Sequence, residues 1–213
     1  MTVMRYAFVG DSITAGTGDD DFLGWPGRVC VRERKAGHDV TLYNLGVRGD
    51  TSALIEPRWR KECEARFPPD VPCAIVFAFG INDSAEDVGK GLRVPLPESL
   101  KLARKMLTEA KAWRPTLWIG PTPVDETLQP MRPRPGMVYD FRNARIVEYS
   151  KAYAVLAAEL GVPYLDCYAP FEKNAQIAAD LHALDGVHPL RDGYGLMAER
   201  VAAWPAWRKL LDS

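Results

Sequence analysis

The sequence lacks the features that would direct it to a membrane or to nucleic acid. No apolar run approaches the roughly 18 residues that a membrane helix needs. The 27 basic and 28 acidic residues leave a formal net charge of −1, so there is no basic field of the kind that binds phosphates. The apolar stretch at residues 1–10 has neither a basic leader nor a cleavage-site pattern and is interpreted as a strand. We therefore expect neither stable membrane insertion nor a nucleic-acid partner.

Paired cysteines are also missing. Cys30, Cys63, Cys73 and Cys167 are widely spaced and form no CxxC pair. A chain of 213 residues does not need disulfides to fold, so we expect free, mostly buried thiols in a reducing cytoplasm. Isolated cysteines are also poor zinc ligands, and the run at residues 19–21 (Asp-Asp-Asp) lacks the alternating ligand spacing of a calcium loop. No metal or organic cofactor is expected.

Strand and helix patterns alternate along the whole chain. The apolar runs are continuous, as expected for parallel strands covered on both faces. The expected strands are Val3–Val9, Val40–Leu45, Ala74–Phe79, Thr116–Ile119 and Pro163–Cys167. The expected helices are Pro26–Ala36, Ser52–Phe67, a segment between Pro97 and Pro115, a segment that ends at Gly161, and Arg191–Trp204.

This alternation predicts a doubly wound α/β sheet with right-handed crossovers. The length and the absence of a linker or repeat predict one domain over residues 1–213. In such sheets ligands bind at the carboxyl ends of the strands, so the loops after the strands should hold the chemistry.

The first three of these loops carry candidate groups for acyl transfer. Ser12 follows the first strand at a strand-to-helix turn, where helix amides favour negative charge, although a plain N-cap would have the same pattern. Gly46 follows the second strand and could present a bare N–H to a substrate, but glycines are common in turns. Asn82 follows the third strand and offers a neutral side-chain donor, with a structural turn as the alternative.

The candidate base lies near the C-terminus, just before a predicted helix. Asp185 precedes His188 by three residues, so its carboxylate can reach one ring nitrogen and leave the other free. Together these loops supply a nucleophile, a base, an orienting carboxylate and oxyanion donors.

These motifs, and their order along the chain, resemble those of the SGNH (GDSL) family of esterases, lipases and thioesterases. Its four blocks match residues 10–13 (Gly-Asp-Ser-Ile), the turn of Asn44 and Gly46, residues 80–83 (Gly-Ile-Asn-Asp) and residues 185–189 (Asp-Gly-Val-His-Pro). Residues 24–26 (Gly-Trp-Pro) are also similar, and Ile13 replaces the more usual Leu.

The resemblance implies a fold and a role for each matched residue. The fold would be a three-layer α/β/α sandwich on a five-stranded parallel sheet, flavodoxin-like in topology. Ser12 would be the nucleophile, His188 the base and Asp185 its orienting carboxylate. The Ser12 amide, Gly46 and Asn82 would form the oxyanion hole. The implied substrate is a small acyl ester or thioester.

Several alternatives stay open at this stage. A carbohydrate O-acetyl esterase would use the same groups, and a non-catalytic flavodoxin-like binding module could use them only to shape a pocket. The loop at residues 121–140 is long and holds five prolines, so we hypothesise that it flanks the acyl pocket, with an exposed connector as the alternative. His38 and His182 are interpreted as structural or exposed. The ester, its chain length and the oligomeric state are not determined.

Overall fold

The computed structural model describes residues 3–211 and is built on a parallel sheet of five strands. Their spatial order is β2-β1-β3-β6-β8. The bounds are β1 Val3–Gly10, β2 Asp39–Gly46, β3 Cys73–Ala78, β6 Thr116–Ile119 and β8 Tyr164–Leu165. This confirms the predicted doubly wound α/β sheet, in which β1 lies between β2 and β3 and the chain winds outward in both directions.

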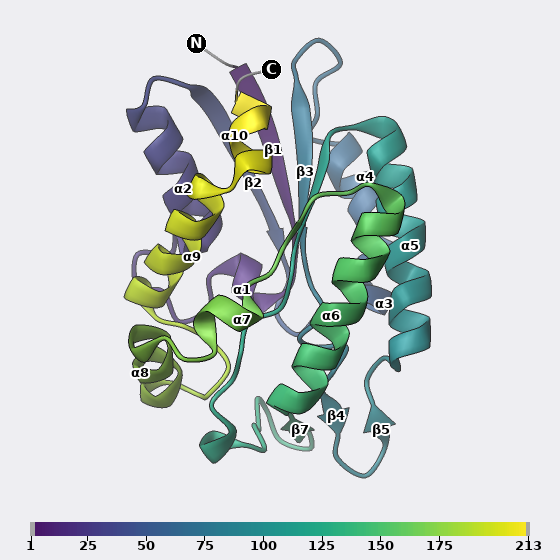
Figure 1. Cartoon of the computed structure of the whole chain (residues 1–213), viewed down its shortest axis with the longest axis vertical. Helices are drawn as coiled ribbons and strands as arrows, with labels where there is room; N and C mark the ends of the chain where they lie inside the picture. Colours follow the sequence, from purple (N-terminus) through teal and green to yellow (C-terminus); the bar gives the residue numbers. More distant parts are fainter. Residues whose placement is uncertain (1–2, 212–213) are drawn as a thin grey trace.

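Helices cover both faces of the sheet, which makes three layers (Figure 1). One layer contains α2 (Gly24–Lys35), α7 (Tyr168–Phe171), α8 (Ala175–Ala183), α9 (Arg191–Ala203) and α10 (Pro205–Leu211). The other contains α3 (Ser52–Ile55), α4 (Trp59–Glu64), α5 (Leu96–Trp113) and α6 (Asn143–Leu160). The short α1 (Ser12–Ala15) follows β1 directly.

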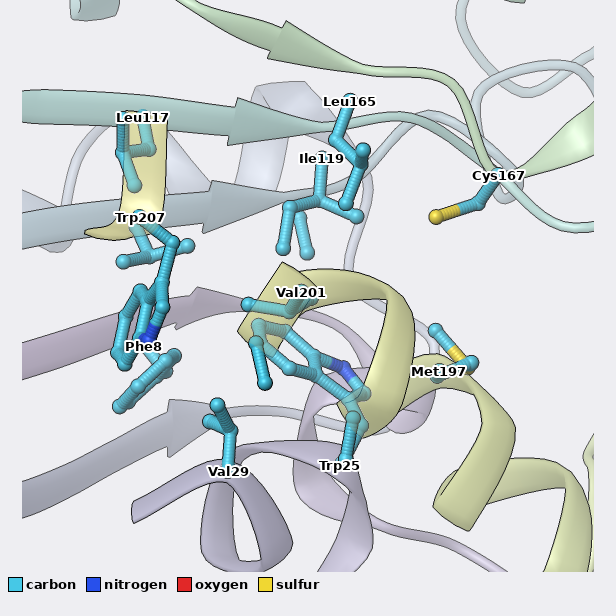
Figure 2. Close-up of a cluster of buried hydrophobic side chains, with 14 of the residues drawn as sticks. Phe8, Trp25, Val29, Leu117, Ile119, Leu165, Cys167, Met197, Val201 and Trp207 are labelled. Carbon is cyan, nitrogen blue, oxygen red and sulfur yellow. The ribbon is translucent and has the colours of Figure 1, made fainter. Parts of the chain in front are cut away.

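Side chains of the strands alternate between two apolar cores, one under each helical layer. Phe8 of β1 packs among residues of α2, α9 and α10, and Figure 2 shows it near Trp207, with Trp25 and Val201 also lining this core. Its neighbour Val9 belongs to the core on the opposite face. Because both faces are buried, the strands are apolar without interruption, which is why they are recognisable in the sequence.

The helix expected at Pro26–Ala36 runs from Gly24 to Lys35. Two other expected helices also differ from the structure, and proline explains where each is interrupted. The helix expected at Ser52–Phe67 is two helices, α3 and α4, with Pro57 in the break between them. Proline has no backbone N–H to continue the helical hydrogen bonds. The last expected helix stops one residue early, and Pro205 starts the separate α10, because proline favours the first position of a helix.

The sequence patterns missed the shortest elements. A small antiparallel sheet has the order β5-β4-β7, from Gly91–Leu92, Glu86–Asp87 and Tyr139–Asp140. The helices α7 and α8, and the 3-10 helix Glu126–Leu128, were also not predicted. The edge strand β8 is shorter than the expected Pro163–Cys167. Elements of two to four residues show no periodicity that a pattern could detect, and this reason does not extend to α8, which has nine residues.

The four cysteines are unpaired and buried, as expected. Within residues 3–211, none of the helices has both the length and the apolar character needed to cross a membrane.

Candidate active site

Ser12 is the first residue of α1, directly after β1, and is buried with 5% of its surface exposed. Asp11 caps this helix, because its Oδ1 accepts from the Ile13 amide at 2.9 Å. Gly10 must be small, since a Cβ there would lie 2.2 Å from both the Ala78 carbonyl oxygen and the Thr14 hydroxyl oxygen. The N-cap of α1 is therefore Asp11, so the Ser12 hydroxyl is not the group that caps this helix.

An unbroken series of hydrogen bonds runs from Ser12 through the histidine to the aspartate. Ser12 Oγ lies 2.8 Å from His188 Nε2, and His188 Nδ1 lies 2.7 Å from Asp185 Oδ2. The other carboxylate oxygen of Asp185 accepts from the Val187 and His188 amides, each at 3.0 Å. One oxygen thus shapes the turn and the other orients the imidazole, so that its far nitrogen faces the serine.

The pKa values of two carboxyl groups of the site are shifted in opposite directions. Burial alone would raise the pKa of Asp185, but the bonds from His188 and the turn amides outweigh it and lower that pKa. Burial raises the pKa of Asp11 to about 6, although the Ile13 amide, His188 and Asn82 oppose the shift. Asp185 is therefore held ionised beside the imidazole.

Asn82 lies in the turn after β3 and is buried against Asp11. Its Nδ2 donates to Asp11 Oδ2 over a long 3.3 Å, and its Oδ1 accepts from Arg93 Nη1 at 2.8 Å. The guanidinium can only donate, so it identifies the oxygen end of the amide. The nitrogen end then faces the Ser12 side of the turn, and one of its two N–H groups has no partner among the described residues.

The structure contradicts the expectation for Gly46. Its N–H donates to Asn44 Oδ1 at 3.0 Å, and Gly46 is not among the residues that line the cavity with Ser12. A Cβ on Gly46 would lie 2.3 Å from the Ala15 amide nitrogen. Gly46 thus allows β2 to pack closely against α1, and its amide is already occupied.

Gly49, three residues later, has the properties that Gly46 lacks. It lines the cavity together with Ser12, Asn82 and His188. Its φ of +81° is a conformation that favours glycine. Its N–H has no hydrogen-bond partner within residues 3–211, while its carbonyl accepts from Arg93 Nη2 at 2.6 Å. Asp50 beside it is held by Arg58, at 2.8 Å.

Ser12 and His188 lie at one wall of a cavity of about 490 Å³. Its other walls are mostly apolar or basic side chains. These are Arg48, Leu54, Arg93, Met131, Pro133, Arg134, Met137, Tyr139, Phe141 and Val187. Five of them come from the loop at residues 121–140, so this loop lies against the candidate nucleophile. A volume of this size is ordinary for a small-molecule site.

Other polar features of the sequence have structural partners. Asp19 accepts from the Gly24 amide at 2.7 Å and from Arg28 at 2.9 Å, so the acidic run begins with a folded turn. His182 is exposed and pairs with Asp125 at 2.8 Å, outside the cavity of Ser12. No cluster of three potential metal-ligating residues occurs within residues 3–211.

Sequence patterns did not indicate that Arg93 and Arg58 belong to the site. They also did not indicate that Gly49, and not Gly46, lines the cavity. Arg58 donates to the Leu45 and Gly10 carbonyls, both at 3.0 Å, and so joins the ends of β1 and β2 to the Gly49 turn. Each arginine reaches across loops that are distant in the chain, and no local spacing indicates such a contact. Gly49 stands in the same turn as Gly46, and only the backbone geometry separates them.

The chain is similar to known proteins over most of its length. Residues 8–196 match the model of the GDSL-like Lipase/Acylhydrolase family. Esterase TesA of Pseudomonas aeruginosa is 27% identical over 208 residues, which cover 95% of this chain and 87% of that protein.

Solved structures share the fold. A lipase/acylhydrolase from Enterococcus faecalis superposes with a TM-score of 0.76 at 23% identity, covering 98% of this chain and 97% of the other. A mutant of Axe2, an acetyl-xylooligosaccharide esterase from Geobacillus Stearmophilus, has a TM-score of 0.73 at 20% identity, with 97% of each chain covered. At these identities the likeness shows the fold alone.

Proposed function

Because this chain belongs to the GDSL-like lipase/acylhydrolase family, we propose that it is a serine esterase that works through an acyl-enzyme on Ser12. The observation that carries the proposal is the series of bonds from Ser12 Oγ to His188 and from His188 to Asp185, at 2.8 and 2.7 Å. A hydroxyl is a poor nucleophile until a base removes its proton, and this series supplies that base.

Acylation begins with proton transfer. His188 Nε2 takes the Ser12 proton as the Oγ–carbon bond forms, and the ionised Asp185 stabilises the imidazolium. The carbonyl oxygen becomes an oxyanion, held by the Ser12 amide, the Gly49 amide and the Asn82 Nδ2 group. When the ester bond breaks, His188 returns the proton to the departing alcohol.

Deacylation repeats these steps with water as the nucleophile. His188 removes a proton from the water as its oxygen bonds to the acyl carbon. The bond to Ser12 then breaks, Ser12 Oγ takes the proton back, and the carboxylic acid leaves. Every group that this cycle requires is a side chain or amide of the chain itself.

The substrate that we propose is an ester or thioester with an apolar acyl chain. Met131, Met137 and Phe141 line the cavity beside Ser12 and offer contact surface beyond what an acetyl group needs. We also place the enzyme in the cytoplasm, where free thiols such as its four unpaired cysteines persist.

Two measurements test the reaction. A fluorophosphonate should label the wild-type protein on Ser12, as located by mass spectrometry, and should not label Ser12→Ala. Wild type should also hydrolyse p-nitrophenyl esters. A protein that is folded, unlabelled and inactive on every ester would be a binding module instead of an enzyme.

A panel of substrates tests the acyl preference. It compares p-nitrophenyl esters of rising chain length with an acetylated sugar. Met137→Ala should shift the preference along the series, because it changes the cavity wall. Leu128→Ala is the matched control, since Leu128 is in the same loop but does not line the cavity. Faster turnover of the acetylated sugar than of every longer ester would favour the carbohydrate O-acetyl esterase.

A further inference from the structure

Arg93 contacts both candidate oxyanion donors from a part of the fold that the chemistry above does not use. It follows β5 in the small antiparallel sheet, inserted between β3 and α5. Its Nη1 donates to Asn82 Oδ1 at 2.8 Å, and its Nη2 donates to the Gly49 carbonyl at 2.6 Å. One rigid guanidinium therefore bridges the turns after β2 and β3.

The surroundings of Arg93 keep it in this position. Its backbone N–H donates to the Ala85 carbonyl at 2.9 Å, which fixes the segment against the Asn82 turn. The ring of Tyr139 covers the guanidinium, with the ring centre 4.4 Å from Cζ. Among the described residues no carboxylate forms an ion pair with Arg93. Its N–H groups are therefore directed at the Asn82 amide and the Gly49 carbonyl, while its charge also opposes the rise that burial causes in the pKa of Asp83.

The orientation of the Asn82 amide decides whether the site stabilises or repels an oxyanion. Rotation of the side-chain amide by half a turn would exchange Nδ2 for Oδ1 and present a lone pair to the developing negative charge. A guanidinium has donors and no acceptor, so it can bond only the oxygen end. The bond from a charged donor also polarises the amide and strengthens Nδ2–H as a donor.

We propose that Arg93 is a positioning residue for the oxyanion hole, which holds the Asn82 amide and the Gly49 turn in the orientation that receives the oxyanion. The inference rests on the proposed esterase function. It also assigns a purpose to the small sheet, since β5 carries Arg93 and β7 carries the Tyr139 ring that covers it.

The test compares Arg93→Met and Arg93→Lys with wild type on a p-nitrophenyl ester. Arg93→Met should lower kcat by about 10- to 100-fold with little change in KM, because misplaced groups cost rate and not ground-state binding. Arg93→Lys, with a single point-like ammonium, should lie between the two. Arg104→Met is the control, because Arg104 of α5 lies outside this cavity and pairs with Glu159 at 2.6 Å.

A double-mutant cycle separates positioning from general structural support. Asn82→Ala removes the amide that Arg93 orients and leaves its bond to the Gly49 carbonyl, so Arg93→Met in that background should cost a clearly smaller factor than in wild type. A trifluoromethyl ketone, which forms an oxyanion on the serine, should lose affinity for Arg93→Met by the same factor as kcat falls. Thermal unfolding checks that each variant is folded, and Arg93→Lys continues the test if Arg93→Met is not.

Two outcomes would contradict the role of Arg93, and a third would contradict the proposed function. Equal losses in both backgrounds, or unchanged kcat in folded Arg93→Met, would overturn the role of Arg93. If wild type itself had no activity that depends on Ser12, the proposed function would fail instead, and the two failures cannot be confused.

Discussion

The two oxygens of Asp185 have separate tasks, so Asp185→Asn can test one of them alone. Oδ1 accepts the Val187 and His188 amides at 3.0 Å, and Oδ2 accepts His188 Nδ1 at 2.7 Å. In the variant the remaining amide oxygen can still accept both backbone amides. The new NH₂ group would face Nδ1, which must then accept, so the proton moves to Nε2 and points at Ser12.

The expected loss has two contributions. A carboxylate and an imidazolium with charge centres about 4 Å apart attract by about 4 kcal/mol at an effective dielectric constant near 20. With 28% of the Asp185 side chain exposed, solvent screening reduces this, which leaves about 10²-fold in rate. The unproductive tautomer of His188 adds to this loss of rate, and we expect kcat to fall about 10³- to 10⁴-fold.

Stopped-flow acylation with a p-nitrophenyl ester measures this directly. Asp185→Ala and Ser12→Ala run beside it, with Ser12→Ala expected to be the most severe because it removes the reacting atom. The melting temperature of Asp185→Asn should stay near that of wild type, since the turn is preserved. An acylation rate within about tenfold of wild type would refute the assignment of Asp185 as the orienting carboxylate.

Four further predictions concern the groups around Ser12. Asn82→Ala should lower kcat by about 10²- to 10³-fold with little change in KM, as measured by steady-state kinetics. Gly49→Ala has open space for its Cβ but an unfavourable φ that costs roughly 1–2 kcal/mol, so kcat should fall about tenfold and the melting temperature by a few degrees. Gly46→Ala meets the α1 backbone and should lower the melting temperature by roughly 5 °C. Asp11 has a folded pKa of about 6 against an ordinary 3.8, so its contribution to stability is present below about pH 4 and is lost as pH rises through about 6. Asp11→Asn removes this loss, and its unfolding free energy in urea, relative to wild type, should rise by about 2 kcal/mol from pH 4 to pH 7.

Each of these has an outcome that contradicts it. Unchanged kcat in Asn82→Ala would remove Asn82 from the mechanism. A normal kcat in Gly49→Ala together with a low kcat in stably folded Gly46→Ala would return the donor role to Gly46. A stability difference between wild type and Asp11→Asn that does not vary with pH would mean that burial does not raise the pKa of Asp11.

The sequence determined the layers of the fold and indicated Ser12 as the candidate nucleophile. Continuous apolar strands need cover on both faces, so their alternation with helices leads to a doubly wound sheet. Ser12, Asp185 and His188 could be predicted as site residues because each stands in a short motif. Asp185 and His188 are also only three residues apart, whereas the contact between Ser12 and His188 spans 176 residues.

Only the tertiary structure decided which groups complete the site around Ser12. Gly46 and Gly49 look alike in the chain. They differ because the Gly46 amide is occupied by Asn44, while the Gly49 amide lies beside the cavity and has no partner within residues 3–211. Arg93 bonds groups 11 and 44 residues away. Such contacts depend on how loops from different strands converge at one edge of the sheet. The direction of a hydrogen bond in a folded turn cannot be predicted from the order of the residues.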